Sequence, residues 1–191
     1  MTAAIIPGTH SMERALVWFR RDLRDVDHAA LSAALRAARA VYCVFILDRN
    51  ILVGLPQQDR RVEFIHASLQ ELDLALRARG GGLIVREGLP EKEIPALAKA
   101  LDVQGVFANR DYEPQAKARD AAVAGLLRNE GLAYFEFKDQ AVFDSEEVLT
   151  GAGKPYTVFT PYSRSWLKRL AQEGVPCHAC EGVLATTPLA K

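Results

Sequence analysis

Apolar residues along this chain follow two alternating patterns. Runs that are apolar at almost every position, without polar alternation, predict strands buried on both faces. Such runs occupy residues 15–19, 41–47, 83–85, 105–108 and 133–137. Helical patterns lie between them, over residues 28–39, 59–79, 90–101 and 113–130. Because buried strands alternate with helices, residues 14–138 are expected to form a three-layer α/β domain, in which helices flank a five-stranded parallel sheet.

The helix predicted over residues 59–79 shows the amphipathic spacing most clearly. Its apolar stripe consists of Val62, Ile65, Leu69, Leu72 and Leu76. Three glycines at residues 80–82 follow it, which is typical of a helix end. Asp27 is expected to be the N-cap of the helix at residues 28–39, because a carboxylate can accept hydrogen bonds from free backbone N–H groups.

The segments outside residues 14–138 lack this alternation. We expect residues 1–13 to be a disordered leader and residues 139–156 an ordered loop region, followed by one further helix over residues 161–173. Residues 174–191 show no clear period and are expected to be a tail or a linker to a further domain.

The charge balance narrows the classes of function. Lys plus Arg and Asp plus Glu each number 24, so the formal net charge is zero. A domain that binds nucleic acid by electrostatics alone would be strongly basic, so strong DNA binding is not expected. No apolar run is long enough to span a bilayer, and residues 1–12 lack the basic start of a signal peptide. A cytoplasmic protein is therefore expected.

Charged and hydrogen-bonding residues follow three of the predicted strands. Strand one is followed by Arg20, Arg21 and Asp22, strand two by Asp48, Arg49 and Asn50, and strand four by residues 109–113. The carboxyl ends of parallel strands meet at one edge, where α/β domains bind ligands. Strand-end loops are polar in any case, so the pattern fits either a ligand site or ordinary surface.

Three short motifs suggest chemistry that their context does not support. GAGK at residues 151–154 lacks the glycine spacing, the following Ser or Thr, and the helix of a phosphate loop. The GGG at residues 80–82 follows a helix instead of a strand, so we interpret it as a turn. Cys177 and Cys180 flank His178, but a structural zinc site needs more ligands, and a redox pair normally opens a helix. No metal ligand and no catalytic residue is predicted.

Three stretches of this chain resemble the DNA photolyase/cryptochrome family, and they occur in the same order as in that family. The family's first strand and loop resemble ALVWFRRDLRDVDHAAL, its motif after strand four resembles NRDYEPQAKARD, and its approach to the second domain resembles KPYTVFTPYSRSWLK. The resemblance covers residues 14–173. One departure is His28, where the family often has Asn, and it affects a local hydrogen bond.

The resemblance implies the Rossmann-like N-terminal domain of a two-domain protein. In many photolyases this domain takes part in holding a light-harvesting antenna, which is a deazaflavin, a flavin (FMN or FAD) or methenyltetrahydrofolate. A larger C-terminal helical domain holds the catalytic FAD and binds damaged DNA, where light-driven electron transfer splits a pyrimidine dimer. By itself, this chain would be an inactive part of a deoxyribodipyrimidine photo-lyase. We favour an excised domain of a longer protein over a freestanding relative.

The same resemblance supplies candidate antenna residues. They are Arg20, Asp48, Arg49, Asp111 and Glu113, with Glu113 expected to accept hydrogen bonds from ring nitrogens of the antenna. Arg21, Asp22 and Arg24 are expected instead to be a structural ion-pair cluster that ties the first loop to its neighbours.

Two alternatives stay open at this point. A cryptochrome-type photoreceptor module would have the same N-terminal domain without repair activity. A nucleotide-binding α/β domain unrelated to light would use the same crevice, although the chain lacks a glycine-rich phosphate loop.

Overall fold

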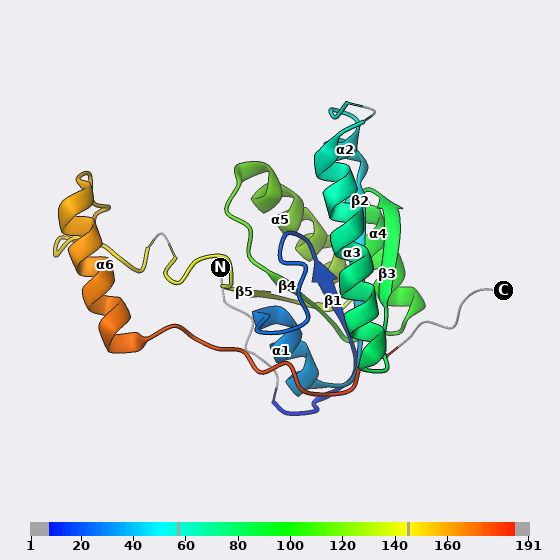
Figure 1. The fold of residues 1–191 in the computed structure, drawn as a ribbon. Coiled ribbons are helices and arrows are strands. Elements are labelled where there is room, and N and C mark those ends of the chain that lie inside the picture. The colour runs from blue at the N-terminus through cyan, green and yellow to red at the C-terminus, as the bar shows by residue number, and fades with distance from the viewer. Residues whose placement is uncertain (1–7, 57, 145, 186–191) are drawn as a thin grey trace.

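Five parallel strands form one sheet in the computed structural model, which describes residues 8–56, 58–144 and 146–185 (Figure 1). The strands are β1 (Met12–Phe19), β2 (Ala38–Asp48), β3 (Leu83–Gly88), β4 (Gly105–Asn109) and β5 (Ala133–Phe137). Their order in the sheet is β3-β2-β1-β4-β5, and every neighbouring pair is parallel. The predicted α/β fold with a five-stranded parallel sheet is confirmed.

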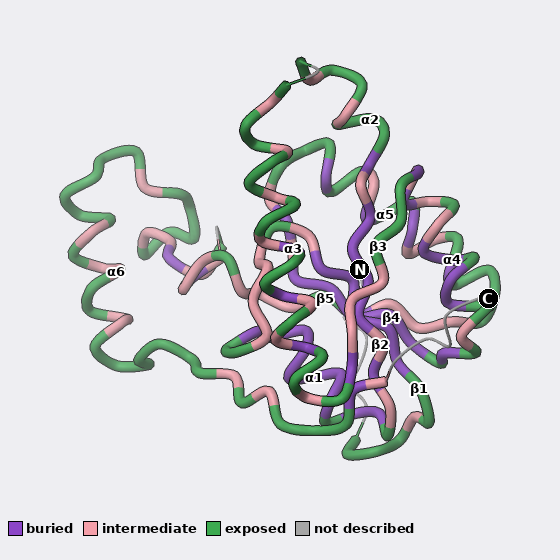
Figure 2. Tube along the Cα trace, turned by 45° about the vertical axis from the view of Figure 1, so that its right-hand side comes forward, coloured by how far each residue is buried: buried purple, intermediate pink, exposed green. Residues whose placement is uncertain are grey.

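Helices cover both faces of this sheet. The described helices are α1 (Ala29–Ala37), α2 (Arg49–Leu52), α3 (Arg60–Ala78), α4 (Pro90–Ala100), α5 (Pro114–Asn129) and α6 (Phe159–Glu173), of which α6 stands apart from the sheet. One apolar cluster joins α1 and α3 to the sheet, and a second joins α4 and α5 to its other face. Figure 2 shows burial concentrated in the sheet and in the helix faces turned toward it.

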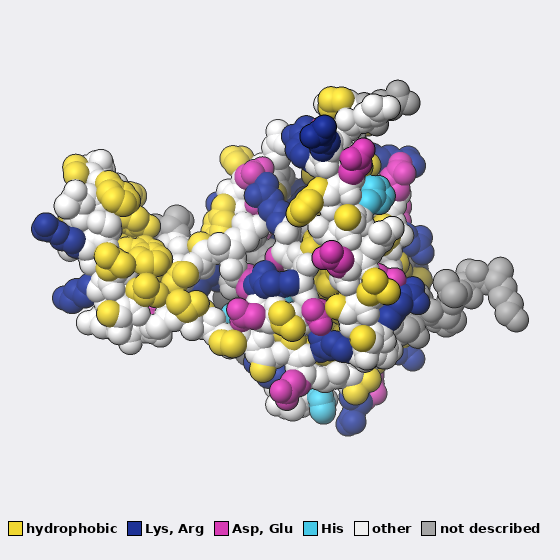
Figure 3. Space-filling model, in the orientation of Figure 1, with side chains coloured by type: hydrophobic (Ala, Val, Ile, Leu, Met, Phe, Trp, Pro, Cys, Tyr) yellow, Lys and Arg dark blue, Asp and Glu magenta, His cyan; other side chains and the backbone are white. Residues whose placement is uncertain are grey.

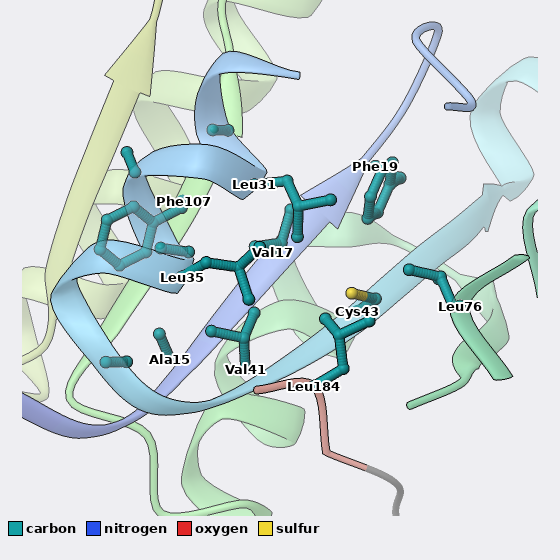
Figure 4. Close-up of a cluster of buried hydrophobic side chains, with 14 of the residues drawn as sticks. Ala15, Val17, Phe19, Leu31, Leu35, Val41, Cys43, Leu76, Phe107 and Leu184 are labelled. Carbon is teal, nitrogen blue, oxygen red and sulfur yellow. The ribbon is translucent and has the colours of Figure 1, made fainter. Parts of the chain in front are cut away.

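Strand β1 supplies both clusters because successive side chains of a strand point to opposite faces. Val17 and Phe19 belong to the α1/α3 cluster, where they pack with Leu31 and Leu76 (Figure 4). Trp18 belongs to the α4/α5 cluster. All three β1 residues are almost fully buried, as the continuous apolar run predicts.

The start and end of α1 differ from the prediction. Asp27 is not the N-cap, because it has the left-handed φ of 48° and its carboxylate accepts a hydrogen bond from the His178 backbone instead. His28 is the N-cap, and its ring Nδ1 accepts from the Leu31 backbone N–H at 3.0 Å. The helix ends at Ala37 rather than at residue 39, since Ala38 already pairs with Met12 in the sheet.

The ends of the chain also differ from the prediction. Strand β1 begins at Met12, inside the segment expected to be a disordered leader, whereas residues 1–7 lie outside the described residues. The segment 174–185, expected to be part of a tail or a linker, packs on the domain, because Leu184 is 5% exposed and joins the α1/α3 cluster. Val41 bonds to this segment through both its backbone N–H and its C=O.

Gly81 makes this docking possible. A Cβ atom at residue 81 would lie 2.5 Å from the Leu184 Cβ, which is closer than side chains approach. The glycines after α3 therefore do more than end that helix, since one of them leaves room for a residue more than a hundred positions away in the sequence.

We predict that Leu184→Ala lowers the free energy of unfolding by about 2–3 kcal/mol, because it removes buried methyl groups and leaves a cavity. Urea denaturation measured by circular dichroism checks this value. Val183→Ala is the matched control, since Val183 is 63% exposed and its truncation should change stability by less than about 0.5 kcal/mol. Equal effects of the two substitutions would contradict the docking of this segment.

Candidate functional site

A cleft opens where the sheet reverses its strand order. The chain passes from β1 outward to β2 and β3, and then returns to place β4 on the other side of β1. Loops after β1 and β4 therefore leave in opposite directions, and ligands bind at such a switch point in α/β domains. The cleft has a volume of about 1040 Å³ and lies between the ends of β1, β2 and β4 and the starts of α4 and α5.

Four of the five predicted antenna residues line this cleft. Arg20, Asp48, Asp111 and Glu113 come from three different strand ends and meet there. Arg49 does not line the cleft, because its guanidinium forms an ion pair with Glu87 at 3.0 Å on the surface. Its neighbours Asp48 and Asn50 do line the cleft. The position of Arg49 in the first turn of α2 turns its side chain toward the neighbouring strand β3.

A packed group of aromatic and charged side chains lines one part of the cleft, called here its floor. The guanidinium carbon atoms of Arg20 and Arg119 lie 4.8 Å and 5.0 Å from the ring centroid of Trp18. Asp120, from α5, pairs with both arginines. Burial lowers the pKa of Arg20, but Tyr134 and Asp120 outweigh that effect and raise the pKa above its ordinary value. The cleft floor thus carries a permanent, immobilised positive charge.

The rim of the cleft is more exposed. Arg21 Nη2 lies 2.6 Å from Glu113 Oε1 and its Nε lies 3.5 Å from Asp111 Oδ2. The side chain of Glu113 is 62% exposed, whereas that of Asp111 is 7% exposed. Exposed ion pairs are weak and rearrange easily, so the Arg21–Glu113 pair can open to a ligand with little loss of stability.

Apolar side chains line the middle of the cleft. They include Trp18 from β1, Phe45 and Ile46 from β2, Leu52 from α2 and Ile65 from α3. Sequence analysis assigned Trp18 and Ile65 to the core and missed their place in the cleft. Trp18 is paired with β2 and β4 inside the sheet and Ile65 lies in α3, and an apolar pattern does not show which buried side chains also border a cleft.

A buried polar junction holds the loops behind the cleft. His28 is completely buried, and its Nε2 lies 2.9 Å from Asp22 Oδ2. Since Nδ1 accepts from the Leu31 N–H, Nε2 carries the proton and donates it to Asp22. The hydrogen bond at the start of α1 is therefore present although His28 replaces the family's usual Asn. An imidazole nitrogen can accept from a backbone N–H there, as a side-chain amide oxygen can.

Asn109 extends this junction at the end of β4. Its Oδ1 accepts from the Ala30 N–H at 2.9 Å, and its Nδ2 donates to Asp22 and to Asp139. Arg24 pairs with Asp139 at 2.8 Å. Asp22 and Arg24 thus tie the first loop to α1, β4 and the segment after β5, as expected, whereas Arg21 pairs at the rim of the cleft.

The Cys177–Cys180 motif belongs to the segment that crosses α1. The Cys180 Sγ accepts a hydrogen bond from the His28 N–H at 3.4 Å, and burial raises the pKa of this thiol.

Within the described ranges, no group of three or more His, Cys, Asp or Glu side chains has an arrangement that could hold a metal ion. None of the described helices is long and apolar enough to cross a membrane.

The fold and the cleft define the class of α/β domains that bind a ligand at a topological switch point. The sequence model of the family described as DNA photolyase matches residues 15–181, so this chain belongs to the DNA photolyase family. The family predicted from the three motifs is thereby confirmed.

Curated relatives agree with this assignment. The deoxyribodipyrimidine photo-lyase of Synechococcus sp. is 34% identical over 151 residues, which are 79% of this chain and 31% of that protein. The deoxyribodipyrimidine photo-lyase of Halobacterium salinarum is 35% identical over 184 residues, covering 92% of this chain and 38% of that protein. This chain therefore spans about a third of the length of these relatives.

Solved structures show the same architecture. An archaeal photolyase from Sulfolobus tokodaii, described with two FAD molecules and a novel light-harvesting cofactor, has a TM-score of 0.76 at 27% identity. That match covers 91% of this chain and 38% of the photolyase chain. A class III photolyase from Agrobacterium tumefaciens has a TM-score of 0.75 at 28% identity. That match covers 100% of this chain and 37% of the photolyase chain.

We predict that Asp22 makes the domain sensitive to acid. Burial raises the pKa of Asp22, but hydrogen bonds from His28 and Asn109 outweigh burial and hold the pKa well below the ordinary value of 3.8. A carboxyl with a depressed pKa in the folded state stabilises the fold above its unfolded pKa, and this contribution falls as the pH drops below about 4. Asp22→Asn should be less stable by about 2 kcal/mol at pH 7, with a smaller loss of stability between pH 4 and pH 2.

Thermal unfolding over this pH range measures the effect. Asp102→Asn is the control, because the Asp102 side chain is 84% exposed and its pairing with Arg14 is on the surface. An unchanged acid profile in Asp22→Asn would show that the buried junction is not the source of the acid sensitivity.

Proposed function

We propose that this chain is the N-terminal light-harvesting domain of a DNA photolyase, and that the cleft holds its antenna chromophore. In the longer protein, a helical domain would carry the catalytic FAD and use light to split cyclobutane pyrimidine dimers. Membership of the photolyase family and the position of the cleft support this proposal. The antenna supplies absorbed light energy; the residues of this chain bind it, orient it and exclude water from it.

The cleft itself is the observation that carries the proposal. Its volume of about 1040 Å³ suffices for a tricyclic heterocycle with a side chain. It combines an apolar middle with a few polar groups at the floor and the rim, as small-molecule sites do. We favour a flavin or a deazaflavin over methenyltetrahydrofolate, because a folate in this family draws partly on the second domain.

Four residues are proposed to bind the antenna. Arg20 at the floor offers a fixed guanidinium, whereas Asp48 and Asp111 are nearly buried carboxylates. Glu113 at the rim would exchange its pairing with Arg21 for a hydrogen bond from the antenna. Arg49 is left out of this set, because it does not line the cleft.

Helix α6 supports the proposed contact with a second domain. It stands apart from the sheet and its helices (Figure 1), and none of its residues is buried. Trp166 packs edge-on against Phe143, but Phe159 is 76% exposed and Leu167 is 58% exposed. Figure 3 shows apolar side chains gathered on this helix. Such an exposed apolar surface is typical of an interaction site.

Absorption and fluorescence titration of the purified chain tests the proposal. Riboflavin, FMN, 5-deazariboflavin and methenyltetrahydrofolate are added separately, and we expect saturable quenching or a spectral shift with a flavin or the deazaflavin. Glu113→Ala should weaken that binding about tenfold, because it removes a hydrogen bond to the ligand. Glu130→Ala, at the far end of α5, is the matched control and should bind as the unchanged chain does. Unchanged affinity in Glu113→Ala would remove Glu113 from the site, and no binding of any chromophore would contradict the antenna function.

A second prediction concerns α6. The isolated chain should self-associate through the exposed side chains of this helix as its concentration rises. Substituting both Phe159 and Leu167 by Ser should reduce this association and leave the melting temperature within about 2 °C, since neither side chain is buried. Sedimentation velocity of both proteins checks the result. Equal self-association of the two proteins would show that α6 is not the apolar contact surface.

A further inference from the structure

Trp18 is the residue at the cleft whose side chain can give up an electron. The other described residues that line the cleft are aliphatic, charged or amide-bearing, apart from Phe45, and none of them is Tyr, Cys, Met or His. Indole is oxidised easily, whereas a phenyl ring is not. A chromophore bound in this cleft would therefore lie beside one electron donor, Trp18.

Electron transfer from Trp18 would defeat a light-harvesting site. A chromophore in its excited state is a stronger oxidant than in the dark, so a nearby indole can pass it one electron and become an indole radical cation. Return of that electron to the indole releases the absorbed energy as heat. Trp18 is only 2% exposed, but electrons pass between neighbouring aromatic groups without open contact. The environment of the indole then sets the rate of this loss.

Two guanidinium groups lie against the Trp18 ring. The Cζ atom of Arg20 is 4.8 Å from the ring centroid, and the Cζ atom of Arg119 is 5.0 Å from it. The two arginine side chains are 8% and 15% exposed, so little water screens them from the ring. A cation is attracted to the electron-rich face of a neutral indole and is repelled by an indole radical cation. Both arginines therefore oppose the removal of an electron from Trp18.

Asp120 holds the two arginines in place without cancelling their charge. Its carboxylate pairs with Arg20 Nη1 and lies 2.9 Å from Arg119 Nη2. Within this group of three side chains, two guanidinium groups face one carboxylate and leave an excess of one positive charge. The charge is permanent, because a guanidinium does not lose its proton in proteins.

Trp166, the other tryptophan of the chain, has a different environment. It packs edge-on against Phe143, and the described contacts place no Lys or Arg over its ring. The paired guanidinium groups are thus a feature of the tryptophan at the cleft.

We infer that Arg20 and Arg119 make Trp18 a poor electron donor, so that the cleft can hold an excited chromophore beside an indole ring without quenching it. Arg119 acts here as a positioning residue, since its effect on the ligand passes through Trp18. This inference rests on the proposed function, because it concerns the excited state of the ligand in the same cleft.

Fluorescence lifetimes of riboflavin, bound at saturation to the full 191-residue chain, test the inference. Arg119→Gln removes one positive charge and keeps a hydrogen-bond donor for Asp120. We expect it to shorten the bound lifetime at least about threefold, because one cation over the indole is lost. Trp18→Phe by itself should leave the lifetime unchanged. The double variant Trp18→Phe with Arg119→Gln should regain the long lifetime, since the donor is then absent.

Two further variants separate the effect of charge from general damage. Arg119→Lys keeps a cation near the ring and should retain the long lifetime. Arg128→Gln, in the last turn of the same helix, is the matched control and should leave the lifetime unchanged. If Arg119→Gln does not fold, the comparison between the unchanged chain and Trp18→Phe decides alone.

Oxidation of the ligand-free chain by azide radicals gives a second measurement, which needs no chromophore. These radicals take one electron from tryptophan, and peptide mass spectrometry then gives the oxidised fractions of Trp18 and Trp166. We expect the ratio of Trp18 to Trp166 oxidation to rise at least about threefold in Arg119→Gln and to stay unchanged in Arg119→Lys.

The outcomes separate the two proposals. A longer lifetime in Trp18→Phe, an unchanged lifetime or oxidation ratio in Arg119→Gln, or a lifetime that stays short in the double variant overturns the inference. Each of these results leaves the antenna function intact, because the chromophore is bound in all of the lifetime measurements. Failure of the unchanged chain to bind riboflavin and 5-deazariboflavin overturns both proposals.

Discussion

The burial of β1 on both faces is the constraint on which the rest of this structure depends. With β2 on one side and β4 on the other, this strand has no free edge, and its side chains alternate between two apolar clusters. The return of the chain from β3 to β4 across β1 creates the switch point. The cleft exists because the loops after β1 and β4 diverge there.

Charged residues that follow β1 serve two different purposes, because the chain leaves the sheet after Phe19. Asp22 and Arg24 turn into a buried junction with His28, Asn109 and Asp139. That junction fixes the first loop relative to α1 and β4. Arg20, on the other face, is held by Asp120 against Trp18 and forms the floor of the cleft. A buried floor behind an exposed rim is suited to orienting a chromophore, since the fixed groups set its geometry and the rim admits it.

Helix α6 and the segment after it differ in their contact with the α/β domain. Residues 174–185 return to the domain, and Leu184 fills a position against Val41 beside Gly81. Helix α6 keeps its apolar side chains at the surface.

The sequence by itself determined the α/β class, the five strands and the photolyase family, because buried parallel strands and the three motifs are local patterns. It also placed Arg20, Asp48, Asp111 and Glu113 at one edge, since strand ends of a parallel sheet meet there. Only the tertiary structure decided that Arg49 turns to Glu87, that His28 caps α1, and that Leu184 joins the core. Each depends on a partner distant in sequence or on a side-chain direction, and a linear pattern of apolar and polar residues carries no information about either.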